Sequence, residues 1–158
     1  FILYNNKFSS VTHSGNHISI NGNLDKKLCI NVKNTINTVY EEAKKYCNEK
    51  TINYAPIIMR INSMNGHPGE IHSLVRYMHE KIKCPFYTIN EKVIGGYSTH
   101  LFLAGKQKFF HKNAIIYVPH FHHEDKIEYF LDDYDNYIPM VKLNSDEALK
   151  HHYCDKII

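Results

Sequence analysis

Short apolar stretches rich in β-branched residues alternate along this chain with longer stretches whose apolar residues recur every three or four positions. The first pattern predicts strands buried within a sheet, and the second predicts helices with one buried face. The predicted strands cover residues 17–21, 56–61, 85–89 and 115–118, and the predicted helices cover residues 25–46, 70–82, 95–104 and a segment from 145 on. Strands that alternate with helices run parallel and are joined by right-handed crossovers. We therefore expect an α/β fold with a parallel sheet built from repeated β-α-β units.

The length and charge of the chain fit one globular domain that binds no nucleic acid. A chain of 158 residues can form a sizeable hydrophobic core, and we treat residues 1–158 as one domain with an N-terminal arm or strand at 1–16. The formal net charge is +3, but the lysines are scattered among acidic residues and do not form the basic face that nucleic-acid binding requires. No apolar stretch has the length needed to cross a bilayer, so we also expect no membrane partner.

The cysteines and histidines carry residue types that bind metals, but their spacing does not favour a metal site. The cysteines are Cys29, Cys47, Cys84 and Cys154. They form no C-x-x-C pair, so we predict reduced cysteines that pack in the core. Histidines gather at 120–124, in a stretch without periodicity, and at 151–154, where adjacent residues of a helix do not share one face. We therefore predict neither a metal nor another cofactor.

Three segments resemble, in the same order along the chain, the proteolytic subunit of the Clp protease family. Residues 57–66 end in Ile-Asn-Ser-Met-Asn-Gly, which is similar to the family's strand and Ile-Asn-Ser-Pro-Gly-Gly turn. Residues 95–105 are similar to the helix that begins at the family's nucleophile and runs to Ala-Gly, and residues 143–158 parallel its Leu-Ser-Ala-Pro-Glu-Ala and Tyr-Gly-Leu-Val-Asp-Ser-Ile. The resemblance covers residues 17–121 and 140–158, and it implies the ClpP/crotonase-like fold.

The family cleaves peptides with a Ser-His-Asp triad, and the resemblance places these three positions at Gly96, Pro119 and Met140. None of these side chains can act as a nucleophile, a general base or an orienting acid. The resemblance places the backbone donors of the family's oxyanion hole at Gly66 and Tyr97, although Asn65 stands where the family has another glycine. It therefore implies a degenerate serine peptidase that keeps the protease fold.

The segment between Pro119 and Met140 departs from the family in length. There the family has a further strand and a long helix, the handle that joins two rings face to face, and this segment is too short for both. Residues 120–139 are therefore a remnant of the handle, or a stretch of the protein is missing from this sequence. The chain begins at Phe1 and not at Met, so we expect that a targeting segment has been removed.

By this resemblance we expect a pseudoprotease subunit of the ClpR type in a heptameric ring. Its partners would be an active Clp proteolytic subunit and an AAA+ Clp chaperone, and its role would be structural or regulatory. Rings with inactive subunits occur in plastids. The chain is rich in Asn and Lys, with Arg60 and Arg76 as its only arginines, which is typical of an AT-rich genome. We therefore expect a relict plastid, the apicoplast.

Two other functions remain open at this point. An active peptidase with a displaced triad would need Ser98 or His120, which lie on other sides of their elements than the family's residues, and an acid from 132–135. A crotonase-type acyl-CoA enzyme would need only paired backbone donors, and the turn at Gly66 and the start of the third helix are compatible with it. The match at 143–158 favours the protease branch over this second alternative.

Overall fold

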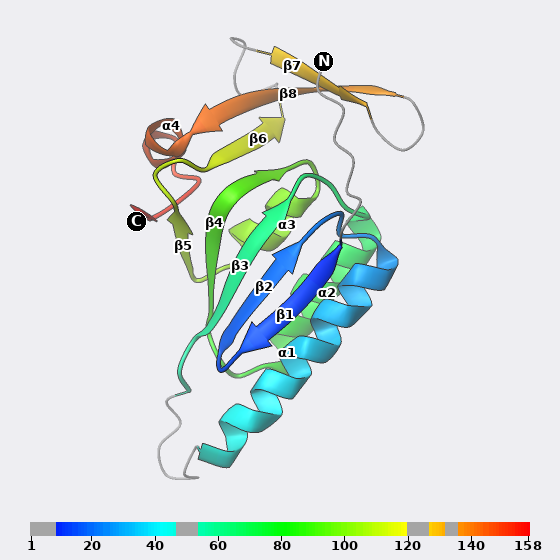
Figure 1. Cartoon of the computed structure of the whole chain (residues 1–158), viewed down its shortest axis with the longest axis vertical. Coiled ribbons are helices and arrows are strands. Elements are labelled where there is room, and N and C mark those ends of the chain that lie inside the picture. Colours follow the sequence, from blue (N-terminus) through cyan, green and yellow to red (C-terminus); the bar gives the residue numbers. More distant parts are fainter. Residues whose placement is uncertain (1–8, 47–53, 120–126, 132–135) are drawn as a thin grey trace.

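The computed structural model describes residues 9–46, 54–119, 127–131 and 136–158, which form a sheet with helices packed against it (Figure 1). The strands are β1 (Ser10–Ser14), β2 (His17–Asn21), β3 (Ile57–Ser63), β4 (Phe86–Gly95), β5 (Gln107–Phe110), β6 (Ile115–Pro119), β7 (Ile127–Leu131), β8 (Tyr137–Asn144) and β9 (Lys156–Ile157). The helices are α1 (Lys26–Tyr46), α2 (Pro68–Lys81), α3 (Ser98–Leu103) and α4 (Ser145–Lys150). The predicted α/β class is confirmed.

The sheet is parallel at its centre and antiparallel at its two ends. The strands follow the order β1-β2-β3-β4-β6-β8-β7, and β5 branches from β4 and pairs in turn with β9. Strands β2 to β6 pair parallel to their neighbours, as predicted. Beyond these strands the sheet is antiparallel, because β1 is antiparallel to β2, and β8 is antiparallel to β6 and β7. At the N-terminal end a turn at Gly15, with a φ of +58°, allows this pairing by closing a hairpin.

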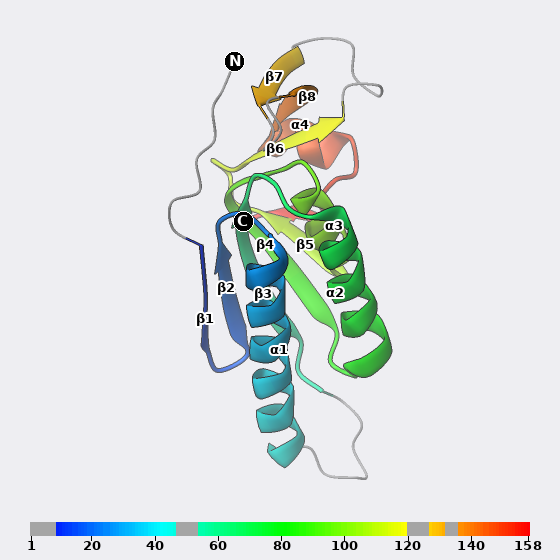
Figure 2. The same ribbon diagram turned by 90° about the vertical axis from the view of Figure 1, so that its right-hand side faces the viewer.

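Helices α1, α2 and α3 cover one face of the sheet (Figure 2). The buried residues of α1 follow the predicted three- and four-residue steps and join the strands in the main hydrophobic core. From α1 and the strands this core includes Leu28, Val32, Ile36, Val39, Ile18, Ile20, Met59 and Ile61. Helix α2 begins two residues before the predicted start, at Pro68. The reason is that His67 caps it by accepting a hydrogen bond from Glu70 N, and proline needs no N–H donor at the first helical position.

Strand β4 is longer than the strand predicted at 85–89 because it pairs with two strands in succession. Its first half pairs with β5 as far as Asn90, and Val93–Gly95 pairs with β6. At this point the buried Asn90 side chain joins β4 to the start of β6, since its Nδ2 donates to Ile115 O at 3.0 Å. The sequence analysis predicted no structure for the polar residues in the middle of β4, which lie where the sheet divides.

The segment after Pro119 contains strands that the sequence did not predict. Strands β7 and β8 form an antiparallel pair, whereas 120–126 and 132–135 lie outside the described residues. In the described part of 120–139 no helix is present. The period-two pattern of a strand is hidden in β7 because its exposed positions carry Ile127 and Tyr129, which are large and partly apolar.

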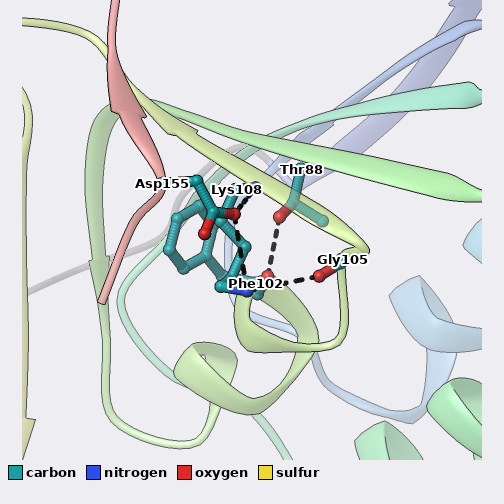
Figure 3. A network of polar contacts seen from close by, with 5 residues as sticks. All are labelled: Thr88, Phe102, Gly105, Lys108 and Asp155. Carbon is teal, nitrogen blue, oxygen red and sulfur yellow. Dashed lines mark hydrogen bonds and ion pairs between the residues drawn. The ribbon is translucent and has the colours of Figure 1, made fainter. Parts of the chain in front are cut away.

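The C-terminal segment is tied to β5 by a short polar network (Figure 3). The Asp155 carboxylate accepts a hydrogen bond from Lys108 N at 2.7 Å, and its Oδ2 lies 3.6 Å from Lys108 Nζ. Nearby, Thr88 Oγ1 donates to Phe102 O at 2.7 Å, which joins β4 to α3. Strands β5 and β9 were not predicted because each is too short to show a periodic pattern.

Helix α4 begins at Ser145, as predicted, and is preceded by Asn144, which forms a capping box with Glu147. The Asn144 side chain accepts from Glu147 N, and the Glu147 side chain accepts from Asn144 N. Asn144 is therefore the cap, and not Ser145, whose hydroxyl donates instead to Lys112 O at 2.8 Å. Both residues have side chains that suit the role, so the sequence alone did not separate them.

The structure tests the prediction that the cysteines pack in the core. Cys29, Cys84 and Cys154 are buried, as predicted, and Cys47 lies outside the described residues. Burial raises the pKa of the Cys29 thiol to about 12, and the charges of Glu70 and Asp25 act in the same direction.

Among the helices that the structure describes, none combines the length and hydropathy needed to cross a membrane.

Candidate functional site

The positions that the resemblance assigns to a catalytic site lie near the ends of neighbouring strands. Gly66 follows β3 and Gly96 follows β4, so both lie at the carboxyl ends of adjacent parallel strands, where α/β folds place their binding sites. Pro119 ends β6 and is the register partner of Met140 in β8. The fold therefore brings four positions that are far apart in the sequence to one end of the sheet.

Residue 96 lies in a left-handed turn that is enclosed by the loop after β3. Its φ is +58°, a conformation that favours glycine. A Cβ at this position would lie 2.9 Å from Asn65 Oδ1 and 3.0 Å from Met64 O. Because the chain first makes this turn, α3 begins at Ser98 and not at the predicted residue 95. The space in front of residue 96 is thus occupied by another side chain.

Met140 lies in a second apolar cluster, which consists of Met64, Tyr117, Phe130 and Met140. Its side chain is 6% exposed. The rings of Tyr117 and Phe130 pack edge to face, with centroids 4.6 Å apart. Pro119, across the strand pair, is exposed and has no titratable group. The cluster is therefore an apolar environment at the place where the family's acid would stand.

Two titratable side chains occur at this second apolar cluster: Tyr117 belongs to it, and Glu128 interacts with Tyr117. Glu128 in β7 is the register partner of Met140. Burial raises the pKa of Tyr117 to about 12, and the charge and hydrogen bonding of Glu128 act in the same direction. A phenol with this pKa stays protonated near neutral pH, so Tyr117 cannot serve as a general base there.

Ser98, the alternative nucleophile, is fully buried and its hydroxyl is engaged. Ser98 Oγ lies 2.9 Å from Asn65 O and 2.7 Å from Ser63 Oγ, and Ser63 Oγ lies 3.1 Å from Asn65 O. The two hydroxyls have two protons for three contacts, so each donates once within this triangle. Ser98 therefore serves the turn after β3, and the structure does not place it beside a base.

The turn after β3 holds Gly66 in a fixed position. Asn65 O also accepts a hydrogen bond from Leu24 N at 2.9 Å. A Cβ on Gly66 would lie 2.4 Å from Ile71 Cδ1 and 2.8 Å from Leu24 O, so only glycine fits there. In the described part of the chain, the N–H groups of Gly66 and Tyr97 donate no hydrogen bond. Both backbone groups expected at an oxyanion hole are thus unpaired within that part.

The remaining candidate residues give no further site. His120, the histidine-rich segment at 120–124 and the acidic residues Asp132, Asp133 and Asp135 lie outside the described residues. Within the ranges that the structure describes, no three His, Cys, Asp or Glu side chains come together as metal ligands would. The predictions of no metal and no cofactor stay predictions.

Sequence reasoning identified the Asn65 departure but missed what surrounds it. Ser63 and Ser98 lie on different elements, and nothing in their spacing indicates that both hydroxyls meet at one carbonyl oxygen. Met64 could have been noticed, because an exposed turn rarely carries a large apolar residue unless that residue packs against another element. Its packing partners come from β6, β7 and β8, so they became visible only with the fold.

Comparison with solved structures identifies the fold. The chain is similar to an asparagine-to-aspartate mutant of ClpP1 from Listeria monocytogenes, with a TM-score of 0.65, and the alignment covers 91% of each chain at 15% sequence identity. No family model matches the sequence, and no curated protein matches it. The chain therefore has the fold of a Clp proteolytic subunit, as the three resembling segments predicted.

Proposed function

We propose that this chain is a catalytically inactive subunit of the Clp protease family, with a structural or regulatory role in an oligomeric ring. The proposal is carried by the ClpP fold together with Gly96, Pro119 and Met140, which stand at the positions that the sequence resemblance assigns to the triad. Peptide hydrolysis by this family requires a nucleophile and a base. Loss of a whole triad lowers the turnover of a serine protease by about a millionfold.

The geometry supports this proposal because the environment of the site, and not only its side chains, differs from what a triad needs. A buried carboxylate at residue 140 would lie among Met64, Tyr117 and Phe130, where ionisation is strongly disfavoured. A serine at residue 96 would contact Asn65 and Met64. Single substitutions at the triad positions would therefore not recover a catalytic arrangement.

We infer the assembly and its partners by analogy with Clp proteolytic subunits, which share this fold. A subunit of this kind would sit in a heptameric ring with an active proteolytic subunit and would work with an AAA+ Clp chaperone. It would set the subunit composition of the ring and form part of the surface on which the chaperone docks. We propose a plastid of the apicoplast type as its location, on the strength of the resemblance and the Asn- and Lys-rich composition.

Labelling with a fluorophosphonate serine probe tests the absence of catalysis. The purified protein is expected to show no covalent modification, while an active Clp proteolytic subunit in the same conditions is labelled stoichiometrically. Light scattering, alone and after mixing with that active subunit, tests the ring. Stoichiometric labelling of this chain would contradict inactivity, and a monomer in both samples would contradict the assembly.

A further inference from the structure

Asn65 and Gly96 occupy one small volume between the turn after β3 and the start of α3. A side chain at residue 96 would point at the Asn65 carboxamide. An ideal Cβ built on Gly96 would lie 2.9 Å from Asn65 Oδ1 and 3.5 Å from Asn65 Cγ. The Asn65 carboxamide therefore fills the space that a serine, or a carbonyl held against it, would require.

The backbone of Asn65 is held in place by groups on three separate elements. Its carbonyl oxygen lies within hydrogen-bond distance of Leu24 N, Ser63 Oγ and Ser98 Oγ. Both serines are fully buried, so these contacts are shielded from water. The next residue, Gly66, cannot shift either, because it is in close contact with Ile71 and Leu24. The carboxamide thus projects from a rigid base, and only its own side-chain torsions are free to change.

We propose that the Asn65 carboxamide closes the site, with Ser63 and Ser98 as positioning residues that keep it over residue 96. This inference rests on the proposed function, and it deepens that function by naming what keeps ligands from the vacant nucleophile position. Because the nearest obstructing atom is the end of a flexible side chain, removal of that side chain opens this part of the space without movement of the backbone. The backbone oxygen of Met64, 3.0 Å from the same Cβ, stays in place.

Gly15 provides a matched control for residue 96. Its φ is also +58°, but no atom lies within 4 Å of a Cβ built on it. A substitution at Gly15 therefore carries the same backbone strain as one at Gly96 and lacks the contact with Asn65. The two positions share the left-handed conformation and differ in their surroundings, since the Asn65 side chain and the backbone oxygen of Met64 lie close only to residue 96.

The test introduces a cysteine at each glycine and measures its alkylation by iodoacetamide in the native protein. The four variants are Gly96→Cys and Gly15→Cys, each with and without Asn65→Gly. Peptide mapping by mass spectrometry separates the new thiol from the natural cysteines. Since covered thiols react far more slowly than exposed ones, Asn65→Gly is expected to speed alkylation at residue 96 by about tenfold and to leave residue 15 unchanged. Equal rates at residue 96 in both backgrounds would overturn the inference.

A second measurement covers the case in which Gly96→Cys does not fold. In the unmodified protein, nuclear Overhauser contacts between the Asn65 side-chain protons and the Gly96 α-protons are expected, and their absence would overturn the inference. Neither measurement depends on catalysis. Fluorophosphonate labelling of the natural chain would contradict the proposed function alone, whereas an uncovered residue 96 would contradict this inference alone.

Discussion

Pro119 in β6 and Met140 in β8 are register partners across an antiparallel pair of strands. The sequence located them separately, Pro119 from the end of a predicted strand and Met140 by its distance from Leu143. A histidine and an aspartate of one triad must lie side by side, and these two positions do. The register therefore supports the alignment on which the proposed loss of catalysis depends.

Replacement of Met140 by aspartate should destabilise the protein without giving activity. The new carboxylate would be buried in the second apolar cluster, and an uncompensated buried charge costs about 3–5 kcal/mol. Urea unfolding at pH 8 measures the change. The control is Met140→Leu, which keeps the volume and should cost less than about 1.5 kcal/mol. Equal stability of the aspartate and leucine variants would show that residue 140 is accessible to water.

Ser63→Ala and Ser98→Ala should be coupled in their effects on the free energy of unfolding. Each single variant loses the contact between the two hydroxyls, and the double variant loses that contact only once. Each substitution should cost about 0.5–1.5 kcal/mol, and the double variant should cost less than the sum. A denaturation cycle measures the coupling.

The matched control for this cycle pairs Ser63→Ala with Ser145→Ala. The Ser145 hydroxyl donates to Lys112 O and shares no partner with Ser63, so these effects should add. Additivity in the first cycle as well would mean that the two hydroxyls do not act on Asn65 together.

Tyr117 should make the folded state less stable as the solution becomes strongly alkaline. Its pKa is raised from 10.0 to about 12 in the folded protein, so the unfolded chain loses this proton first. The free energy of unfolding should therefore fall between about pH 10 and pH 12, and below pH 10 Tyr117 should contribute no pH dependence. Tyr117→Phe removes the titrating group and should make this fall shallower, as measured by denaturant titrations at several pH values. An identical pH profile in the variant would place the ionisation elsewhere.

Gly66→Ala should disrupt the turn that carries the proposed backbone donor. The added methyl group would lie 2.4 Å from Ile71 Cδ1 and 2.8 Å from the backbone oxygen of Leu24, which cannot move aside freely. A loss of about 1–3 kcal/mol is expected in thermal or urea unfolding, the usual range for overpacking. At Gly69 the same methyl group would meet only His67 Cε1, at 3.2 Å, so Gly69→Ala should be tolerated far better. Equal losses at both glycines would contradict the close packing around residue 66.

The elements predicted from the sequence are those whose buried apolar residues recur regularly on one face. Helix α1 was predicted within a residue because its apolar residues face a single core. The middle of β4 was missed because Asn90 lies at a division of the sheet, where its buried side chain donates a hydrogen bond to Ile115 O in β6. At the site, the assignment of Gly96, Pro119 and Met140 to the triad rests on the sequence resemblance and stays a prediction. The Asn65 carboxamide over residue 96 depends on the contact of two loops, which no local pattern encodes.

The double pairing of β4 also limits which changes in chain length the protein can accept. A single residue inserted or deleted between Asn90 and Val93 would rotate Val93–Gly95 to the opposite side of the sheet, because side chains alternate along a strand. Gly95 and Gly96 would then turn away from Met64 and Asn65, and β6 would lose its register. Natural variation in length should therefore be absent from the middle of this strand in proteins that share this arrangement.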